Sequence, residues 1–297
     1  MDFALTDEQQ ELSRIVRALL ERHAGSAAVR AAAITETGYD ADLWRLLSEE
    51  VGAAALAIPE EFGGAGFSWF ETALVLEAVG YSLAPTPLLA SAVLAADALL
   101  LSSNDEACER LLPAIAEGSS IGTVAWADRS GHWRTDGSDV TATPADSWVL
   151  DGTARLVLDG TSADVVLVVA TTSNGVGLFE VADENGLVRT TTPAVDPTLR
   201  LATLEFAATP ARLLLDDACC DGGAAGAGIR RRCVPAGGRG PTRARHDRRV
   251  LEATSAVRPR DRQLPGAQAP DGGHARRRRD LAHRGLGRRV VGSRHRR

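Results

Sequence analysis

The chain has 297 residues, of which 44% are hydrophobic, so it is long enough for one large domain or two ordinary ones. Its charge is uneven, because residues 1–217 carry 12 Arg against 33 acidic residues, whereas residues 218–297 carry 21 Arg against 6. The two parts therefore have net charges of −21 and +15. The chain has no Lys, which excludes a phosphate-binding loop that ends in Gly-Lys-Ser or Gly-Lys-Thr.

Nothing near the start of the chain indicates secretion or a membrane. The N-terminus MDFALTDEQQ is acidic and lacks the apolar core of a signal peptide. The longest apolar stretch, residues 88–101, is interrupted by Asp97 and is shorter than the roughly 20 residues that a membrane helix needs. Four Cys are too few for a disulfide framework in a chain of this length. We therefore expect a soluble, cytoplasmic protein.

Two capping boxes predict helix starts in the first part of the chain. Thr6 with Gln9 and Ser68 with Glu71 each place a hydroxyl three residues before a residue that can bond back to it. After the first box, apolar residues recur at helical spacing on one face. These residues are Leu12, Ile15, Val16, Leu19 and Leu20. The pattern predicts a helical domain over residues 1–120.

Further along this domain, glycines and prolines separate the predicted helices. The second capping box predicts a helix over residues 69–79, and Pro85 and Pro87 open another apolar helix. A last helix is predicted to end near Gly118, and Cys108 within it is interpreted as a buried thiol. The glycines in Gly64-Ala-Gly66 do not complete a nucleotide-binding fingerprint, because the third glycine is replaced by Trp.

From residue 121 to residue 215 the pattern changes to strands. The runs 165–170 and 176–181 are rich in β-branched residues, which favour strands. Four Asp-Gly or Asn-Gly pairs predict tight hairpins. They are Asp151-Gly152, Asp159-Gly160, Asn174-Gly175 and Asn185-Gly186. The sequence therefore predicts an α+β fold, in which the all-α domain is followed by an antiparallel β-domain over residues 121–217.

After Asp217 the periodicity stops. Residues 218–297 are dominated by Gly, Arg, Pro and Ala, which predicts a disordered basic tail rather than a third core. Such a tail could bind nucleic acid through phosphate contacts, but it has no aromatic residue except His for base stacking, so this partner is not expected. Its metal-binding candidates match no zinc spacing, so no metal site is predicted. They are Cys219, Cys220, Cys233 and His246.

Four segments resemble acyl-CoA dehydrogenases in their order and spacing. MDFALTDEQQELSRIVRALLERHA resembles the first helix of that family, and IPEEFGGAGFSWFETALVLEAVGYSLAPTPLLAS resembles the next block. LLPAIAEGSSIGTVAWAD is similar to the passage from the last N-terminal helix into the first strand. WVLDGTARLVLDGTSADVVLVVA resembles the middle of the β-domain. The APTPLLAS block is similar to a divergent actinobacterial-type branch, used in fatty-acid, sterol or related catabolism.

This resemblance implies FAD as the cofactor, an acyl-CoA thioester as the substrate and an electron-transfer flavoprotein as the electron acceptor. It places Trp126, Ala127 and Asp128 in the strand whose backbone meets the flavin ring, and Val157 and Leu158 in a second flavin-facing segment. Alternatively, Trp126 and Leu158 belong to the core of the β-domain. The family normally carries further FAD contacts, usually the catalytic base, and most contacts of its homo- or hetero-oligomers in a third, helical domain, so no catalytic residue is predicted here.

That third domain leaves a trace in the adjacent reading frame. Residues 250–274, VLEATSAVRPRDRQLPGAQAPDGGH, permit YSKQRVQFGRAIGSFQALKHRMADM when the gene is read one nucleotide later. The second string resembles the FAD-binding signature of the third domain, although the middle base of each shifted codon is mostly free. We therefore expect a frameshift near residues 217–221 that leaves dehydrogenase activity impaired or absent. Two alternatives stay open, namely a non-catalytic partner subunit of a heteromeric dehydrogenase and a protein with a nucleic-acid-binding tail.

Overall fold

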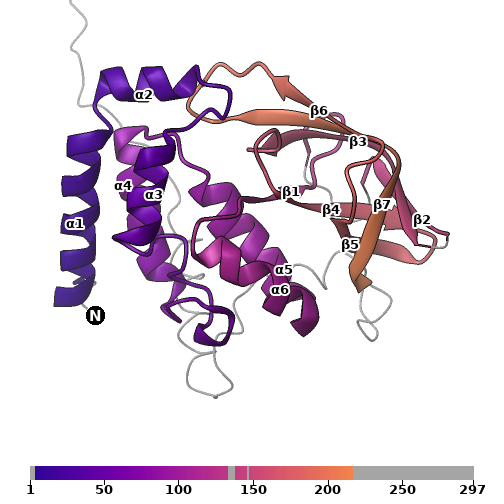
Figure 1. Cartoon of the computed structure of the whole chain (residues 1–297), viewed down its shortest axis with the longest axis horizontal. Helices are drawn as coiled ribbons and strands as arrows, with labels where there is room; N and C mark the ends of the chain where they lie inside the picture. Colours follow the sequence, from indigo (N-terminus) through magenta and orange to yellow (C-terminus); the bar gives the residue numbers. More distant parts are fainter. Residues whose placement is uncertain (1–3, 133–137, 146, 217–297) are drawn as a thin grey trace, which may run out of the picture. The chain divides into compact units, whose positions relative to one another are not determined.

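The computed structural model describes residues 4–132, 138–145 and 147–216, all of which lie in one compact unit. The predicted disordered tail, its cysteines and the reading-frame break fall outside the described residues. Within the described part, helices come first and strands second (Figure 1). The helices are α1 (Asp7–His23), α2 (Ser26–Ala33), α3 (Ala41–Glu49), the 3₁₀ turn η1 (Glu60–Phe62), α4 (Trp69–Ser82), the π-helix η2 (Leu89–Ala95), α5 (Ala96–Ser102) and α6 (Asp105–Ala116).

Both predicted capping boxes are present. The hydroxyl of Thr6 accepts a hydrogen bond from the amide of Gln9 at 3.2 Å and starts α1, and Ser68 starts α4 in the same way. The latter helix ends at Ser82, three residues beyond the predicted end. It continues through Gly80, because a glycine at an exposed position is tolerated within a helix. It ends where Leu83 adopts a positive φ of 51°. None of the described helices has the length and apolarity to cross a lipid bilayer.

The apolar helix predicted after Pro85 and Pro87 is wound as a π-helix, η2, before it continues as α5. This segment packs closely on the first strand. A Cβ added to Gly122 would lie 2.6 Å from the Cβ of Ala95, so only glycine fits there. The amide of Gly122 donates to the hydroxyl of Ser91, which is fully buried, at 2.9 Å. The π-helix therefore fixes the start of the strand that leads to the predicted cofactor residues.

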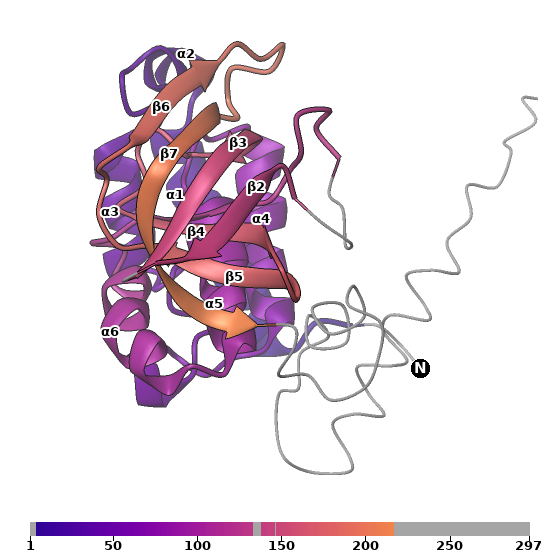
Figure 2. The same cartoon turned by 90° about the vertical axis from the view of Figure 1, so that its right-hand side faces the viewer.

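The strands form a ring. Along the hydrogen-bonded neighbours the order is β4, β2, β3, β7, β5 and back to β4, while β1 joins β4 and β6 joins β7. Figure 2 shows β2, β3 and β7 side by side as curved ribbons. The strand bounds are β1 (Gly122–Ala125), β2 (Val140–Pro144), β3 (Trp148–Leu158), β4 (Val165–Thr172), β5 (Gly175–Val181), β6 (Leu187–Thr192) and β7 (Leu201–Asp216).

The prediction of an antiparallel β-domain describes five of the seven pairings between the described strands. The pairings of β1 with β4 and of β2 with β4 are parallel. Parallel neighbours need a long connection between them, and here the chain supplies one because β3 and its flanking loops separate β4 from both partners. The sequence pattern identifies strands but does not show which of them become neighbours.

The hairpin prediction is right at one of its four positions. Asn174-Gly175 joins β4 to β5, which pair directly. Asp151-Gly152 instead lies inside β3, where Gly152 has a φ of 128° and the register against β7 shifts. There the carboxylate of Asp151 accepts from the amide of Ala208 at 2.8 Å. The other two pairs, at residues 159–160 and 185–186, connect strands that do not pair with each other.

Helices and strands share part of their core. One apolar cluster contains α6 residues such as Leu112 and strand residues such as Leu167 and Leu178. As predicted, Cys108 is buried in this cluster, and its burial raises the pKa of the thiol to about 11.

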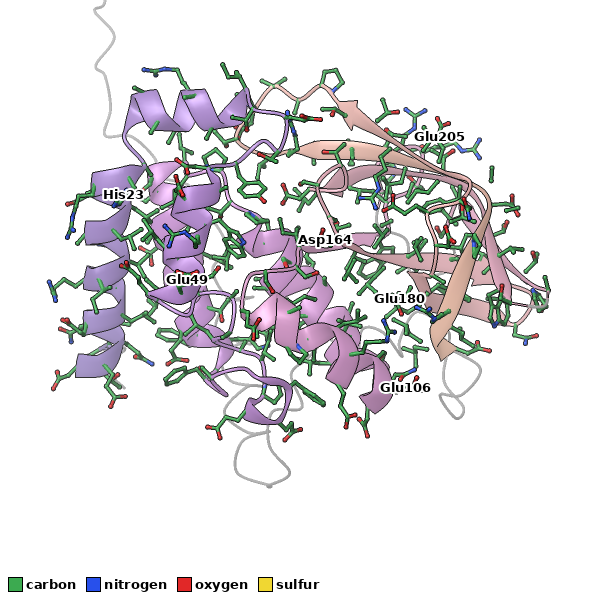
Figure 3. All side chains as sticks on the ribbon, viewed as in Figure 1. His23, Glu49, Glu106, Asp164, Glu180 and Glu205 are labelled. Atoms are coloured by element: carbon green, nitrogen blue, oxygen red, sulfur yellow. The ribbon has the colours of Figure 1, made fainter. Side chains whose placement is uncertain are left out.

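An ion pair crosses from α6 to the strands. Arg110 donates to both oxygens of Glu180 at 2.7 and 2.6 Å, and Arg212 of β7 adds a third bond at 3.3 Å. The side chain of Glu180, which is labelled in Figure 3, is only 6% exposed. A buried carboxylate of this kind is stable only while its cationic partners are present. These ionic hydrogen bonds therefore connect α6 to β5 and β7.

Candidate functional site

The two segments that were predicted to face a cofactor meet in the fold. β1 runs directly into residues 126–128, and β3 ends with Val157 and Leu158. The hydroxyl of Thr123 donates to the carbonyl of Leu158 at 2.5 Å. The amide of Arg155 donates to the carbonyl of Ala127 at 3.2 Å. These two bonds hold the segments against each other, although β1 and β3 are not paired as strands.

Most of the predicted side chains in these segments are buried. Ala127, Asp128 and Val157 are 4%, 8% and 2% exposed, so their side chains offer little surface to a ligand. Trp126 is half-buried and packs against the cluster that the helices and strands share. Leu158 is also half-buried. Contact with a ligand at these positions would therefore fall mainly on backbone groups and on the outer parts of Trp126 and Leu158.

Asp128 shapes a tight turn. Its carboxylate accepts hydrogen bonds from the amides of Ser130 at 2.8 Å and His132 at 2.9 Å. Its own amide donates to the carbonyl of His132 at 3.0 Å, and Gly131 donates to its carbonyl at 2.9 Å. Side-chain bonds of this kind to the following backbone are typical of Asp in turns. The carboxylate is thus committed to holding residues 128–132.

A strained residue lies beside this turn. Leu156 has a φ of 53° and is 42% exposed, and it lies in the bulge where the register of β3 against β7 shifts between Ala154 and Val157. A Cβ added to Gly131 would lie 2.7 Å from Cδ1 of Leu156, so this side chain covers the turn. Positive φ in a branched residue costs on the order of 1–3 kcal/mol and gathers at functional sites.

Sequence reasoning missed the residues that join the two segments, Thr123 and Arg155. One bond comes from a backbone amide, which no residue pattern reveals. The other comes from a threonine within a short apolar strand, GTVA, where a buried hydroxyl needs a partner. The hydroxyl of this threonine therefore indicates in the sequence that a hydrogen bond is needed. It does not indicate the acceptor, because β1 and β3 are distant in the chain.

Next to Leu158 lies a buried carboxyl group. Asp159 is 8% exposed, has a φ of 50°, and donates its amide to the carbonyl of Arg200 at 2.8 Å. Burial raises the pKa of this carboxyl to about 7. The positive charge of Arg200 acts in the opposite direction and lowers this pKa, but its effect is smaller than that of burial. The neighbouring Tyr39 has a raised pKa because of its burial and because of the charges of Asp164 and Asp159.

We expect Asp159→Asn to stabilise the protein at pH 8 but not at pH 4. The folded-state pKa of about 7 exceeds the unfolded value of about 3.9, so the wild type loses stability as the pH rises through this window. Asn stays neutral and tolerates the same backbone, so the gain should grow to at most about 4 kcal/mol above pH 7. Urea unfolding at both pH values measures it, with the exposed Asp42→Asn as the control. A gain that does not change with pH contradicts this expectation.

Comparison with known proteins identifies the class. Residues 6–119 match the family model described as acyl-CoA dehydrogenase, N-terminal domain. The helices followed by a β-rich region agree with this fold, and residues 6–119 are an N-terminal domain of the acyl-CoA dehydrogenase family. The predicted resemblance is thereby confirmed.

Three particular relatives refine this result. The chain is 53% identical over 120 residues to acyl-CoA dehydrogenase IpdE2 of Mycolicibacterium smegmatis, which covers 40% of this chain and 37% of that protein. It is 33% identical to the Tcur3481-Tcur3483 steroid ACAD variant, with a TM-score of 0.63 over 71% of this chain and 58% of that one. Against the ChsE4-ChsE5 complex of Mycobacterium tuberculosis the identity is 31% and the TM-score 0.64, over 71% and 56% of the two chains. The chain thus spans less than two thirds of each of these proteins.

Proposed function

We propose that the described residues are the first half of an FAD-dependent acyl-CoA dehydrogenase, with the flavin ring against the edge formed by residues 126–128 and 155–158. The junction of these two segments through Thr123 and Arg155 carries the proposal. The family resemblance assigned both segments to the flavin from different parts of the sequence, and the fold joins them. The family match of residues 6–119 supports the same assignment.

The residues at this edge fit a flavin ring that is contacted mainly by backbone groups of the protein. The carboxylate of Asp128 accepts two backbone amides through Oδ1 and is nearly buried, so it offers a ring little hydrogen-bonding surface. Trp126 and Leu158 offer apolar surface, and no hydroxyl side chain occurs at positions 126–128 or 155–158. A bound flavin would supply the hydride acceptor of the reaction. These residues would hold and orient the ring, and we assign no catalytic base among the described residues.

The substrate class that we propose is an acyl-CoA thioester, which is dehydrogenated between its α and β carbons, with an electron-transfer flavoprotein as the electron acceptor. A base would remove the α-proton while the β-hydrogen is transferred as hydride to the acceptor that a bound flavin would supply, which leaves a double bond between the two carbons. The similarity to proteins described as acyl-CoA dehydrogenases supports this class. A sterol-derived acyl group is favoured over a linear one, because one similar structure is described as a steroid ACAD.

We propose further that residues 218–297 are translated out of frame, so that this chain lacks dehydrogenase activity. The abrupt change from a net charge of −21 to +15 near Asp217 supports a break in the frame. So does the signature that the adjacent frame permits at residues 250–274. Sequencing the gene around codons 215–222 tests this directly. If unambiguous sequencing reads show one uninterrupted reading frame through these codons, the proposal is wrong.

We expect the purified chain to contain no stoichiometric FAD and to reduce no dye with acyl-CoA. The matched control is the same gene with one nucleotide removed between codons 217 and 221, which leaves the described residues unchanged. That protein should be yellow and should bind flavin at about one per chain. Flavin content by absorbance and dye reduction measure both proteins. A yellow, active preparation of the unaltered chain contradicts the expectation of inactivity, and two colourless preparations contradict the flavin site.

The second candidate is a non-catalytic subunit that assembles with an intact dehydrogenase. It is favoured by the similarity to a chain of the ChsE4-ChsE5 complex, which contains two different proteins. Co-expression with a flavin-bearing dehydrogenase from the same organism tests it. A stable complex of the two chains supports a subunit role, whereas separate elution of the two chains contradicts it and favours the impaired dehydrogenase.

A tail that binds nucleic acid would appear in a gel shift that is lost on removal of residues 218–297.

A further inference from the structure

Thr123 occupies an unusual position between the two segments of the proposed flavin edge. It is fully buried within β1, and its hydroxyl donates to the carbonyl of Leu158 at 2.5 Å. Its backbone pairs in the other direction, with Val166 of β4. The side chain therefore makes a connection to β3 that the β1–β4 ladder does not provide.

The segment that Thr123 holds follows an irregularity in β3, after which Val157 and Leu158 pair with β7 again. The register of β3 against β7 shifts between Ala154 and Val157, and the chain adopts positive φ at Leu156 and again at Asp159. Removing a buried threonine hydroxyl leaves its carbonyl acceptor without a partner, which changes the local opening equilibrium about tenfold. A hydrogen bond at the end of this bulge can therefore decide where its backbone lies.

The other side of Thr123 is also fixed. The preceding amide, of Gly122, is bound to Ser91 of η2, and Gly122 is packed so closely on Ala95 that no side chain fits. The position of Thr123 along β1 is thus set by the π-helix. Together, Ser91, Gly122 and Thr123 form a chain of contacts that runs from η2 to Leu158.

We infer that Thr123 is a positioning residue that sets the separation between residues 126–128 and residues 156–158. The inference deepens the proposed function and rests on it, because that function is what puts a flavin against the edge formed by these segments. Thr123 acts through the backbone of Leu158, and its fully buried side chain offers no surface to the flavin or the substrate.

The test compares Thr123→Val, which removes the hydroxyl, with Thr123→Ser, which keeps it. The matched control is Thr141→Val, because Thr141 also donates to a carbonyl of β3, that of Asp151 at 3.2 Å, but away from the site. Hydrogen exchange of the full chain is followed in peptides that cover residues 126–132 and 155–160. We expect Thr123→Val to speed exchange there by about tenfold, Thr123→Ser to restore it, and Thr141→Val to leave it unchanged.

A merely structural role gives a different result. If Thr123→Val speeds exchange equally throughout the chain, or if serine does not restore the wild-type rate, the inference is wrong. A second experiment tests the role toward the flavin. It uses the same variants in the frame-restored protein and measures their FAD affinity by flavin fluorescence. Thr123→Val should weaken FAD binding about tenfold there. An unchanged affinity together with faster local exchange overturns the role toward the flavin, whereas absence of FAD binding by the frame-restored parent overturns the proposed function itself.

Discussion

Gly64→Ala is expected to lower the free energy of unfolding by about 3 kcal/mol or more, because the new methyl group has no space. A Cβ at this position would lie 1.9 Å from the carbonyl oxygen of Ile58 and 2.4 Å from its carbonyl carbon. Both are backbone atoms of a buried residue, so neither can rotate away. The same turn is held by bonds from Gly64 to Pro59 at 3.1 Å and from Gly66 to Ile58 at 2.9 Å. The methyl group must therefore open the turn.

The matched control is Gly80→Ala, in which the added methyl group enters open space within α4. Alanine is favoured over glycine in a helix by about 1 kcal/mol, so this variant should be more stable than the wild type. Urea unfolding followed by circular dichroism measures both. If Gly64→Ala is as stable as the wild type, the close approach of the turn to Ile58 is wrong. The glycines at residues 63–66 thus have a structural role that does not require a nucleotide.

Arg110→Met is expected to cost about 2–4 kcal/mol, because it leaves the carboxylate of Glu180 buried with only the weaker partner Arg212. Methionine retains much of the length and apolar surface of arginine, so the loss reflects mainly the missing charge and its two hydrogen bonds. Equilibrium unfolding in urea at neutral pH measures the difference.

The control for this substitution is Arg17→Met. Arg17 pairs with Glu77 at 3.2 Å between α1 and α4, but both side chains are more than half exposed. Exposed pairs contribute about 0–1 kcal/mol, so the same chemical change should have almost no effect here. Equal losses in the two variants would show that the burial of Glu180 does not determine the strength of the pair.

Local features of the fold followed from the sequence because they depend on residues three or four positions apart. The capping boxes at Thr6 and Ser68 and the buried thiol of Cys108 are of this kind. The winding of residues 89–95 as a π-helix did not follow, because an apolar run is compatible with either helix. In the fold, this π-helix packs against Gly122, which is distant in the chain.

The candidate site divides in the same way. Trp126, Ala127, Asp128, Val157 and Leu158 were assigned from a family resemblance, and the fold joins their two segments. Their assignment to a cofactor is still a prediction. The left-handed backbone of Leu156 and the bonds that join the two segments depend on the β3–β7 register and on contacts across the fold. Such contacts have no period in the sequence, so reading it alone could not reveal them.

The last described strand also decides which changes to the gene the fold can survive. β7 is the shared partner of β3, β5 and β6, and its final pairing joins Asp216 to Gly177. A ribosome that has translated codon 216 has therefore delivered every strand of the ring, and the change in composition begins only at the next residues. A mutation that altered the reading frame before Leu201 would remove the partner of three strands at once. One that altered it after Asp216 leaves their pairing possible, so the ring of described strands could still form.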